Sequence, residues 1–288
     1  STILIAVFFG VLMADRITRP LRKLVYATRS LAEGDLNPKI DIHSEDEVGE
    51  LAKSFGEMSK DLKKSYEDLE RKVKERTLEL QKANKKLSET NMELVELNKH
   101  LIYKANEHAE KVTRNEQGYY TGYEFNRIST LTAQKVSKTT NKEEAIPKYV
   151  ISSNAWSYTQ TTGIFIFLTG EANINSNNLA IALPFTCAHE LAHRNGITSE
   201  DEANFFAFYT LYDSSDINLR YSAYAMTLIH TMNSLYSKDA DAYKELASTY
   251  SDKLRHDYDR YSEHWDRYEG EISEMSSKAN DTYLKAQG

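Results

Sequence analysis

Apolar residues recur every seven positions between residues 62 and 101, and this spacing constrains the fold more than any other feature of the chain. One heptad position holds Tyr66, Val73, Leu80, Leu87, Leu94 and Leu101, and the other holds Leu62, Leu69, Ala83 and Leu97, with Arg76 and Thr90 as interruptions. A repeat of this period forms a seam along one helix that is buried only against a second helix. The sequence therefore predicts a long helix that pairs in a coiled coil over residues 70–102.

Composition favours a mainly helical chain and limits its partners. The 288 residues include only 11 glycines and 4 prolines, which leaves little room for long irregular loops. A net charge of −7, with Lys and Glu alternating in the coil, argues against nucleic acid as a partner. The single cysteine, Cys187, excludes an internal disulfide and fits a reducing cytosol. We expect Cys187 to be a buried packing residue.

The first residues indicate a membrane. An uncharged apolar run from Ile3 to Ala14 is followed by Asp15, Arg16, Arg19, Arg22 and Lys23. The run is shorter than the ~20 residues of a spanning helix, so we expect residues 1–16 to be the inner end of a transmembrane helix. A signal peptide would carry its positive charge before the run. The positive-inside rule then places everything downstream on the cytoplasmic side of the membrane.

Residues 17–69 read as two amphipathic helices joined by an extended connector. The first helix opens at Arg19-Pro20-Leu21 and closes at Glu33-Gly34-Asp35-Leu36, and the second opens at Asp46-Glu47-Val48-Gly49-Glu50-Leu51. These motifs resemble the HAMP linker, the signalling module between membrane helices and effectors. Such a module buries its apolar stripes as a parallel four-helix bundle with a second copy, so the resemblance implies a homodimer.

Residues 189–193 read His-Glu-Leu-Ala-His, a pattern typical of zinc hydrolases. His189 and His193 are four positions apart on one helix face and can bind the same divalent ion, while Glu190 is free to act as a base. Pro184, Thr186 and Gly196 provide start and stop signals for this helix. The same pattern also arises by chance in helices where the histidines only cap or fill space. The helix context and the acids downstream favour zinc.

A catalytic zinc site usually has three protein ligands and one open position for water, so one more acid is needed. Ser199-Glu200-Asp201-Glu202 has the form of a capping box that opens a second helix. We predict Glu200 as the third metal ligand and Asn204, one turn later, as the donor that holds its carboxylate. Glu202 is the alternative ligand, and acids in a first helical turn can also be explained by the helix dipole. Ser199 replaces the third histidine of metzincins, so that class is disfavoured.

Five blocks between Tyr103 and Gly288 resemble a family of bacterial membrane-associated proteins of the zinc metallopeptidase type, catalogued as a domain of unknown function. The blocks are residues 169–175, 184–193, 200–205, 220–224 and 280–285. The resemblance implies a gluzincin-like domain over residues 103–288 that holds zinc, uses Glu190 as base and hydrolyses a protein or peptide substrate. The family usually continues past this point, so we also expect the domain to be truncated at its C-terminus.

Local patterns within residues 103–288 predict a small sheet among helices. Strands are expected at 149–158 and 163–168, and helices at 123–136, 217–236, 239–268 and 271–284. The strand at 164–167 is either the sheet edge that holds substrate by strand addition or a core strand, and we weigh the two equally. Tyr221, Tyr224 and His230 are candidates for stabilising an oxyanion, although a structural role is favoured for each of them taken singly.

The sequence thus predicts a mainly α protein: a membrane-helix end at 1–16, a HAMP linker at 17–69, a coiled coil at 70–102, and an α+β zincin-like domain at 103–288. The predicted function is a membrane-anchored zinc metallopeptidase, and its regulation through the HAMP module is a hypothesis. The alternative is a non-catalytic signalling or scaffold protein with a structural or vestigial zinc site. A sensor kinase is disfavoured because the chain lacks a Gly-rich nucleotide lid and a phosphoacceptor helix pair.

Overall fold

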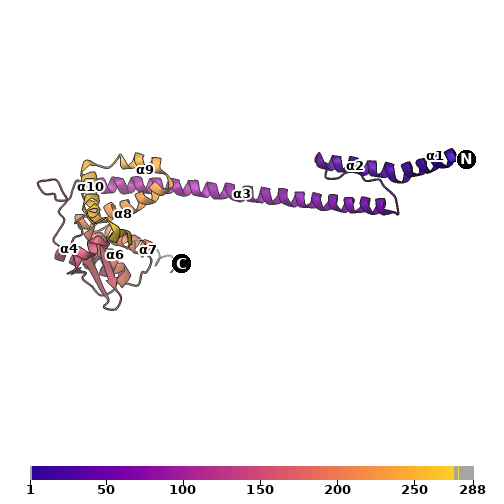
Figure 1. Cartoon of the computed structure of the whole chain (residues 1–288). Helices are drawn as coiled ribbons and strands as arrows, with labels where there is room; N and C mark the ends of the chain where they lie inside the picture. Colours follow the sequence, from indigo (N-terminus) through magenta and orange to yellow (C-terminus); the bar gives the residue numbers. More distant parts are fainter. Residues whose placement is uncertain (1, 276–277, 279–288) are drawn as a thin grey trace. The chain divides into compact units, whose positions relative to one another are not determined.

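The structure, a computed structural model, describes residues 2–275 and 278, and its contacts divide the chain into two compact units, Ser1–Leu87 and Ser88–Gly288. The described part is mainly helical, with one three-stranded sheet in the second unit (Figure 1). Helix α3, Glu47–Ala109, contributes residues to both units. The prediction of a mainly α chain with a small sheet is therefore confirmed.

The first unit contains α1 (Thr2–Met13), the π-helical turn η1 (Ala14–Thr18), α2 (Arg19–Ala32) and the start of α3. Pro20 lies in the first turn of α2, directly after η1, so its missing N–H interrupts the hydrogen-bond ladder of a continuous helical run next to the π-helical turn. Among the described residues, none of the helices combines the length and apolar character needed to cross a bilayer.

Polar contacts define the connector between α2 and α3. Asp46 caps α3 because its Oδ1 accepts from the backbone N–H groups of Val48 (3.1 Å) and Gly49 (3.3 Å). A Cβ at Gly49 would lie 1.9 Å from the backbone oxygen of Ser44, so only glycine fits there. The Ser59 hydroxyl donates to the Leu36 carbonyl at 3.3 Å and holds the connector against α3. The motif from Asp46 to Leu51 thus marks the start of the second helix.

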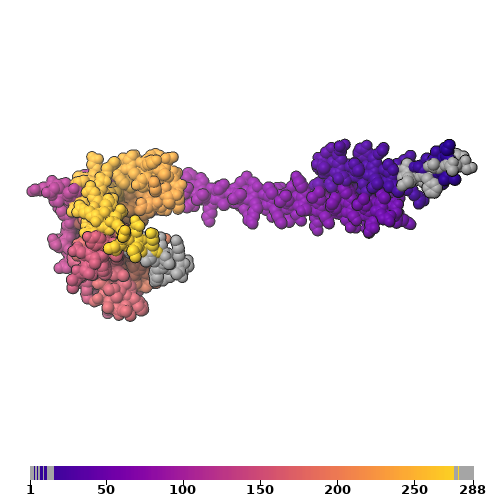
Figure 2. All heavy atoms as spheres, viewed as in Figure 1, coloured from indigo at the N-terminus to yellow at the C-terminus, as the bar shows by residue number. Residues whose placement is uncertain are grey.

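A single chain buries only part of its apolar stripes in this unit. Leu24, Ala27 and Ala52 are buried, whereas Val25 and Leu51 are exposed. All residues from 60 to 90 in α3 are exposed (Figure 2), including the heptad positions up to Leu87. An apolar seam of this length requires a further helix to cover it.

The second unit is built around α8 (Ile217–Lys238), which packs against α6 (Leu183–Arg194), α7 (Glu200–Leu211) and α9 (Ala240–Ala247). Leu101 and Ile102 of α3 are also buried in this core, and Leu94 packs against it. The predicted coiled coil therefore differs from the structure after Leu87. Beyond that residue, Leu101 is buried and Leu94 partly buried within their own chain, whereas Leu97 stays exposed.

The sheet has the order β1-β3-β2, with β1 (Lys148–Val150) parallel and β2 (Gly163–Ile166) antiparallel to β3 (Glu171–Asn175). The strand predicted at 163–168 corresponds to β2, whereas β3 lies outside the predicted strands. The strand predicted at 149–158 is wrong beyond Val150, because Ser153 begins the short helix α5 (Ser153–Tyr158). The Ser153 hydroxyl donates to the Val150 carbonyl at 2.6 Å, which turns the chain.

Apart from α5, the helices of the second unit agree with the predictions except near the C-terminus. The helix predicted at 123–136 corresponds to α4 (Phe125–Thr140). The helix predicted at 239–268 is two helices, α9 and α10 (Asp252–Asp266). Asn106 holds the break between them, donating to the Thr249 carbonyl (3.0 Å) and accepting from the Ser251 N–H (2.8 Å). Residues 271–275 are helical, and most of the remaining predicted helix, with the block 280–285, lies outside the described residues.

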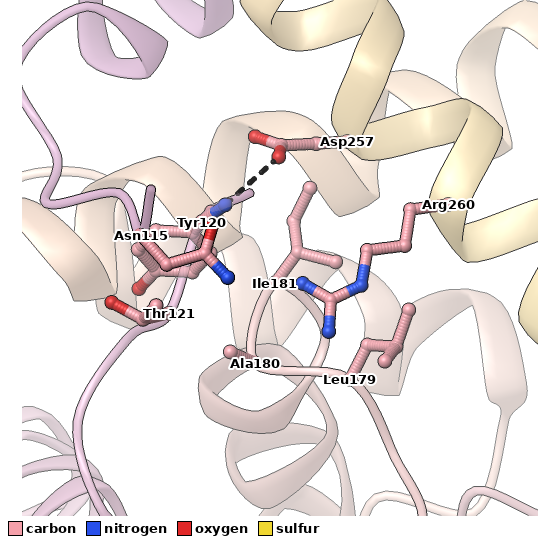
Figure 3. Close-up of a pocket in the computed structure, with 8 residues that line it drawn as sticks. All are labelled: Asn115, Tyr120, Thr121, Leu179, Ala180, Ile181, Asp257 and Arg260. Carbon is pink, nitrogen blue, oxygen red and sulfur yellow. Dashed lines mark hydrogen bonds between the residues drawn. The ribbon is translucent and has the colours of Figure 1, made fainter. Parts of the chain in front are cut away.

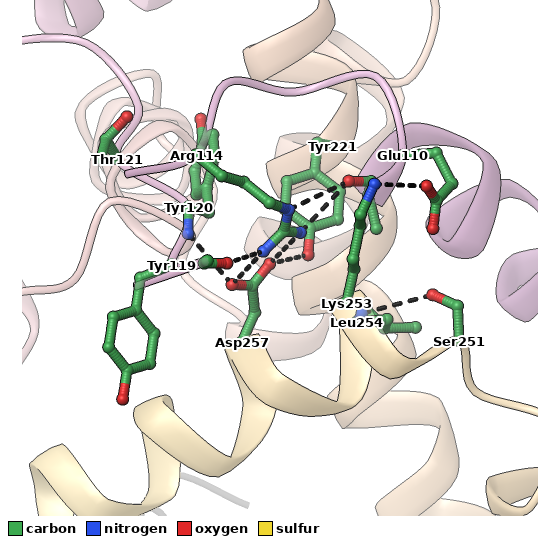
Figure 4. Close-up of polar contacts among 12 residues, drawn as sticks. Glu110, Arg114, Tyr119, Tyr120, Thr121, Tyr221, Ser251, Lys253, Leu254 and Asp257 are labelled. Atoms are coloured by element: carbon green, nitrogen blue, oxygen red, sulfur yellow. Dashed lines mark hydrogen bonds and ion pairs between the residues drawn. The ribbon is translucent and has the colours of Figure 1, made fainter. Parts of the chain in front are cut away.

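A buried ion pair joins the segment after α3 to α10 (Figure 4). The Arg114 guanidinium donates to both carboxylate oxygens of Asp257, at 2.9 and 2.7 Å. Asp257 also accepts from the Tyr120 backbone N–H (3.2 Å) and from the Tyr221 hydroxyl (2.5 Å). A cavity of about 190 Å³ beside this cluster is lined by Asp257, Arg260 and six other residues (Figure 3), and it contains no predicted site residue.

Candidate metal centre

Helices α6 and α7 carry the predicted metal ligands, and a tight turn joins them. Gly196 adopts a φ of +96° just after α6, a backbone conformation that favours glycine. Ser199 is the N-cap of α7 and accepts from the backbone N–H of Glu202 at 3.5 Å, as the capping box predicts. The short turn brings the first residue of α7 back to the last turns of α6.

The side chains of His189, His193 and Glu200 converge. The two histidine Nε2 atoms are 3.0 Å apart, and carboxylate oxygens of Glu200 lie 3.1 Å from His189 Nε2 and 3.6 Å from His193 Nε2. Ligands at zinc bond lengths of ~2.0–2.2 Å in a tetrahedron are separated by about 3.3 Å. The two imidazole nitrogens and the Glu200 carboxylate are thus spaced as ligands of one zinc ion would be.

The other nitrogen of each imidazole already has an acceptor. His193 Nδ1 donates to the Ile197 backbone carbonyl at 2.7 Å, and His189 Nδ1 donates to Asn204 Oδ1 at 2.9 Å. When both imidazoles are neutral, both Nε2 atoms therefore carry lone pairs, which face each other at 3.0 Å beside a carboxylate. Lone pairs so close repel one another unless a proton or a metal ion lies between them, so the donor set of the neutral histidines fits a divalent metal.

Two details of the ligand prediction are resolved by these contacts. The sequence predicts that Asn204 holds the Glu200 carboxylate, but its Oδ1 instead accepts from His189, because the side chain points across to α6. Glu202, the alternative ligand, is exposed, and its side chain is not part of the converging group. Among the described residues, the group that can share an ion is His189, His193 and Glu200.

Glu190 lies beside the cluster and is almost fully buried, with 4% of its surface exposed. Burial raises the pKa of its carboxyl to about 7, although the charge of His189 opposes this shift. The backbone N–H of Phe165 in β2 opposes the shift as well, because it favours the charged form of the carboxylate. A carboxyl that exchanges its proton near neutral pH is suited to act as a general base.

The charges of the ligands are mutually dependent. Burial disfavours the protonated form of His189, but hydrogen bonding to Glu200 and the charge of Glu190 prevail and raise its pKa. The hydrogen bond from His189 in turn lowers the pKa of Glu200. Glu200 therefore presents a carboxylate to the site, the form in which it binds metal.

The three oxyanion candidates have different surroundings. Tyr221 is fully buried and its hydroxyl donates to Asp257, so it is committed to the Arg114 cluster. Tyr224 is buried between the rings of His108 (5.3 Å) and Phe208 (5.4 Å). The pKa of His230 is lowered first by desolvation and then by the charge of His189. His230 is thus the candidate with an electrostatic link to the metal helix.

Strand β2 is an edge strand, which argues against the core-strand alternative. The side chains of Ile164 and Ile166 are 43% and 37% exposed. The Thr162 carbonyl accepts from the Asn175 N–H at 2.9 Å, so by alternation the backbone groups of Gly163 and Phe165 face the outer edge. Phe165 directs its N–H to Glu190, so this edge lies beside the predicted base.

Three contributors to this site were not predicted. The Ile197 carbonyl leaves no sequence signal, because any residue supplies the same acceptor. Gly163 and Phe165 contact Glu190 from β2. A glycine inside a strand can mark the close approach of another group, so Gly163 within the predicted strand was the signal that could have revealed this contact. Cys187, predicted as a packing residue, is fully buried beside Phe125 and Ile174, as expected.

Comparisons with known proteins match both parts of the chain. The family model described as "Protein of unknown function (DUF3810)" matches residues 71–288, and the HAMP domain model matches residues 12–64. The HAMP prediction is thereby confirmed, and HAMP domains typically function in dimeric signalling proteins. The DUF3810 match begins well before residue 103, the predicted start of the zincin-like domain.

Curated relatives match only short stretches of the chain. The methyl-accepting chemotaxis proteins McpA and McpB of Bacillus subtilis (strain 168) are 46% identical over 55 residues and 51% identical over 39 residues. These matches cover 19% and 14% of this chain, and 8% and 6% of the relatives. The chain thus spans less than a tenth of the length of these relatives. No solved structure matches the chain significantly.

Proposed function

This chain belongs to the DUF3810 family of proteins of unknown function, and we propose that it is a zinc-dependent metallopeptidase that hydrolyses peptide bonds. One observation carries the proposal: His189, His193 and Glu200 direct three lone-pair donors at one point, while both Nδ1 atoms are held by other acceptors. The adjacent Glu190 adds the base that a purely structural zinc site does not need.

In this mechanism Glu190 moves the proton. A zinc ion at the site would act as a Lewis acid and lower the pKa of water to about 7. The Glu190 carboxylate accepts the proton of the attacking water and then delivers it to the nitrogen of the leaving amine. Because Glu190 is buried and its pKa is raised to about 7, it can both take and release a proton near neutral pH.

The substrate in this proposal is an extended peptide that pairs with the outer edge of β2. Antiparallel or parallel addition of a strand satisfies backbone groups and does not depend on sequence. The exposed side chains of Ile164 and Ile166 would contact alternate substrate residues. His230 is the residue that we propose for stabilising the oxyanion, because it lies on α8, which packs against the metal helix, and its ring stacks on that of Phe185 in α6 at 5.9 Å.

Metal content and hydrolysis of casein, measured on the same preparations, test the proposal. Glu190→Gln should retain stoichiometric zinc and lose turnover, because the amide cannot accept the proton. His193→Ala should lose the metal itself. Hydrolysis by Glu190→Gln at the wild-type rate would remove the base assignment. A wild type that binds zinc but cleaves nothing would favour the structural or vestigial site of a scaffold protein.

We further propose that the chain acts as a membrane-anchored homodimer with both units on the cytoplasmic side. The HAMP match, the exposed apolar seam up to Leu87 and the apolar run before Arg16 support this arrangement. In the dimer, a second copy would cover Val25, Leu51 and the exposed heptad positions of α3.

Regulation of the peptidase through α3 is part of this proposal. The α3 residues of the second unit contact α8, where the Thr231 hydroxyl donates to Asn98 Oδ1 at 2.7 Å. Helix α8 in turn contacts the metal helix, because the Phe185 backbone N–H donates to the Ser222 hydroxyl at 3.1 Å. A rotation of α3 would therefore act on α8 and, through it, on the helix that carries His189.

Deletions in the exposed part of α3 test this coupling. Removal of residues 74–77 shifts the heptad phase, whereas removal of residues 74–80 preserves it and serves as the matched control. We expect the four-residue deletion to change the rate of casein hydrolysis by several fold and the seven-residue deletion to leave it near the wild-type value. Equal rates in all three proteins would contradict regulation through this helix.

A further inference from the structure

Gly163 lies directly against the Glu190 carboxylate. A Cβ built at Gly163 would lie 2.7 Å from both Cγ and Oε1 of Glu190 and 3.0 Å from its Cδ. Ordinary contacts of a Cβ begin near 3.4 Å, so a side chain at this position fits only if the Glu190 carboxylate or the strand moves. The glycine is required for space and not for conformation, since its φ is outside the left-handed region.

The backbone of β2 contacts Glu190 at two points. Gly163 packs against the side chain, and two residues later the backbone N–H of Phe165 favours the charged form of the carboxylate. Both residues present their backbone groups to the outer edge of the sheet, because the alternate position, Thr162, bonds to β3. Helix α6 therefore fixes the position of the Glu190 backbone, and β2 limits the positions that its side chain can take.

We propose that Gly163 is a positioning residue for Glu190: by lacking a side chain, it lets the backbone of β2 hold the carboxylate in the orientation that catalysis uses. This role rests on the proposed function, since it acts through the proposed base. In this role Gly163 acts on the reaction through Glu190, by fixing where the carboxylate oxygens lie relative to the metal ligands and the attacking water.

Gly163→Ala tests the proposal, with Gly270→Ala as the matched control. An alanine Cβ would force the Glu190 side chain or the strand to move by about 0.7 Å, the difference between 3.4 and 2.7 Å. Misplacement on this scale lowers catalytic rates by about 10- to 100-fold. We expect kcat for a fluorogenic peptide to fall by that factor with zinc content and KM unchanged. Gly270 has no neighbour within 4 Å of its Cβ position, so its alanine variant should match the wild type.

A double-mutant cycle measured by Tm tests the contact between Gly163 and Glu190 independently of activity. Gly163→Ala should lower Tm by ~5 °C when residue 190 is glutamate, because the new methyl group overpacks the contact. In a Glu190→Ala background the colliding atoms are gone, so the same substitution should leave Tm unchanged. Equal losses of Tm in both backgrounds, or an unchanged kcat, would overturn the positioning role. An inactive wild type would overturn the proposed function, whereas the Tm cycle would still decide whether Gly163 and Glu190 are coupled.

Discussion

Replacing Asn204 by leucine removes the acceptor for the His189 Nδ1 proton while keeping a side chain of similar size. In the structure this hydrogen bond is 2.9 Å long, and the His189 side chain is only 14% exposed, so water can replace Asn204 poorly. The bond keeps the proton on Nδ1 and leaves the Nε2 lone pair free for a metal. We therefore expect Asn204→Leu to weaken zinc binding without removing a ligand.

The size of the effect follows from the state without metal. In the variant, His189 can move its proton to Nε2 and donate to Glu200, whose carboxylate oxygen is 3.1 Å away. Zinc binding must then return the proton to Nδ1, where it is buried without an acceptor, at a cost of about 1–3 kcal/mol. At 1.4 kcal/mol per factor of ten, Kd for zinc should rise by about 10- to 100-fold.

Competition with a chromophoric zinc chelator at pH 7 measures this change. Asn204→Asp is the control, because its carboxylate still accepts from Nδ1 and should bind zinc at least as tightly as the wild type. Circular dichroism and Tm would show that both variants fold. A leucine variant with the wild-type Kd would refute the claim that Asn204 orients His189.

Two further predictions concern stability and are checked by urea or thermal unfolding of the second unit. Arg114→Met should lower the free energy of unfolding by about 3–5 kcal/mol, because it leaves Asp257, whose side chain is 3% exposed, as an uncompensated buried charge. Asp257→Leu in the same chain should restore much of that loss, and no recovery in the double variant would contradict this explanation. Burial lowers the pKa of His108 from 6.5 to about 4. As pH falls from 6.5 to 4, His108 is therefore protonated in the unfolded chain but not in the folded one, and the free energy of unfolding should fall in that window by up to about 3 kcal/mol. In His108→Phe the free energy of unfolding should depend less steeply on pH. Equal slopes in the two proteins would exclude His108 as the source.

Local signals in the sequence determined most of the helices and the nature of the candidate site. The i, i+4 spacing placed His189 and His193 on one face of α6, and the capping signal at Ser199 placed the start of α7 correctly. These features depend on residues a few positions apart, so they are legible without a fold. The HAMP connector was predictable for the same reason, since Asp46 and Gly49 act on their immediate neighbours.

Long-range contacts decided the remainder. The end of α3 reads as a coiled coil by its heptads, yet Leu101 is buried by α8 and other elements more than a hundred residues away in the chain. The break between α9 and α10 likewise depends on Asn106, which is 143 residues from Thr249. Periodicity shows that a helix face must be covered, but it does not show by what.

By itself, the sequence specified which residues could bind a metal and which helices carry them. Only the tertiary structure decided that Asn204 serves His189 and not Glu200, that Ile197 contributes its carbonyl, and that Gly163 lies against the base. The physical reason is that a ligand pattern is local to one helix, whereas the orientation of each ligand depends on groups that other elements bring within hydrogen-bonding distance.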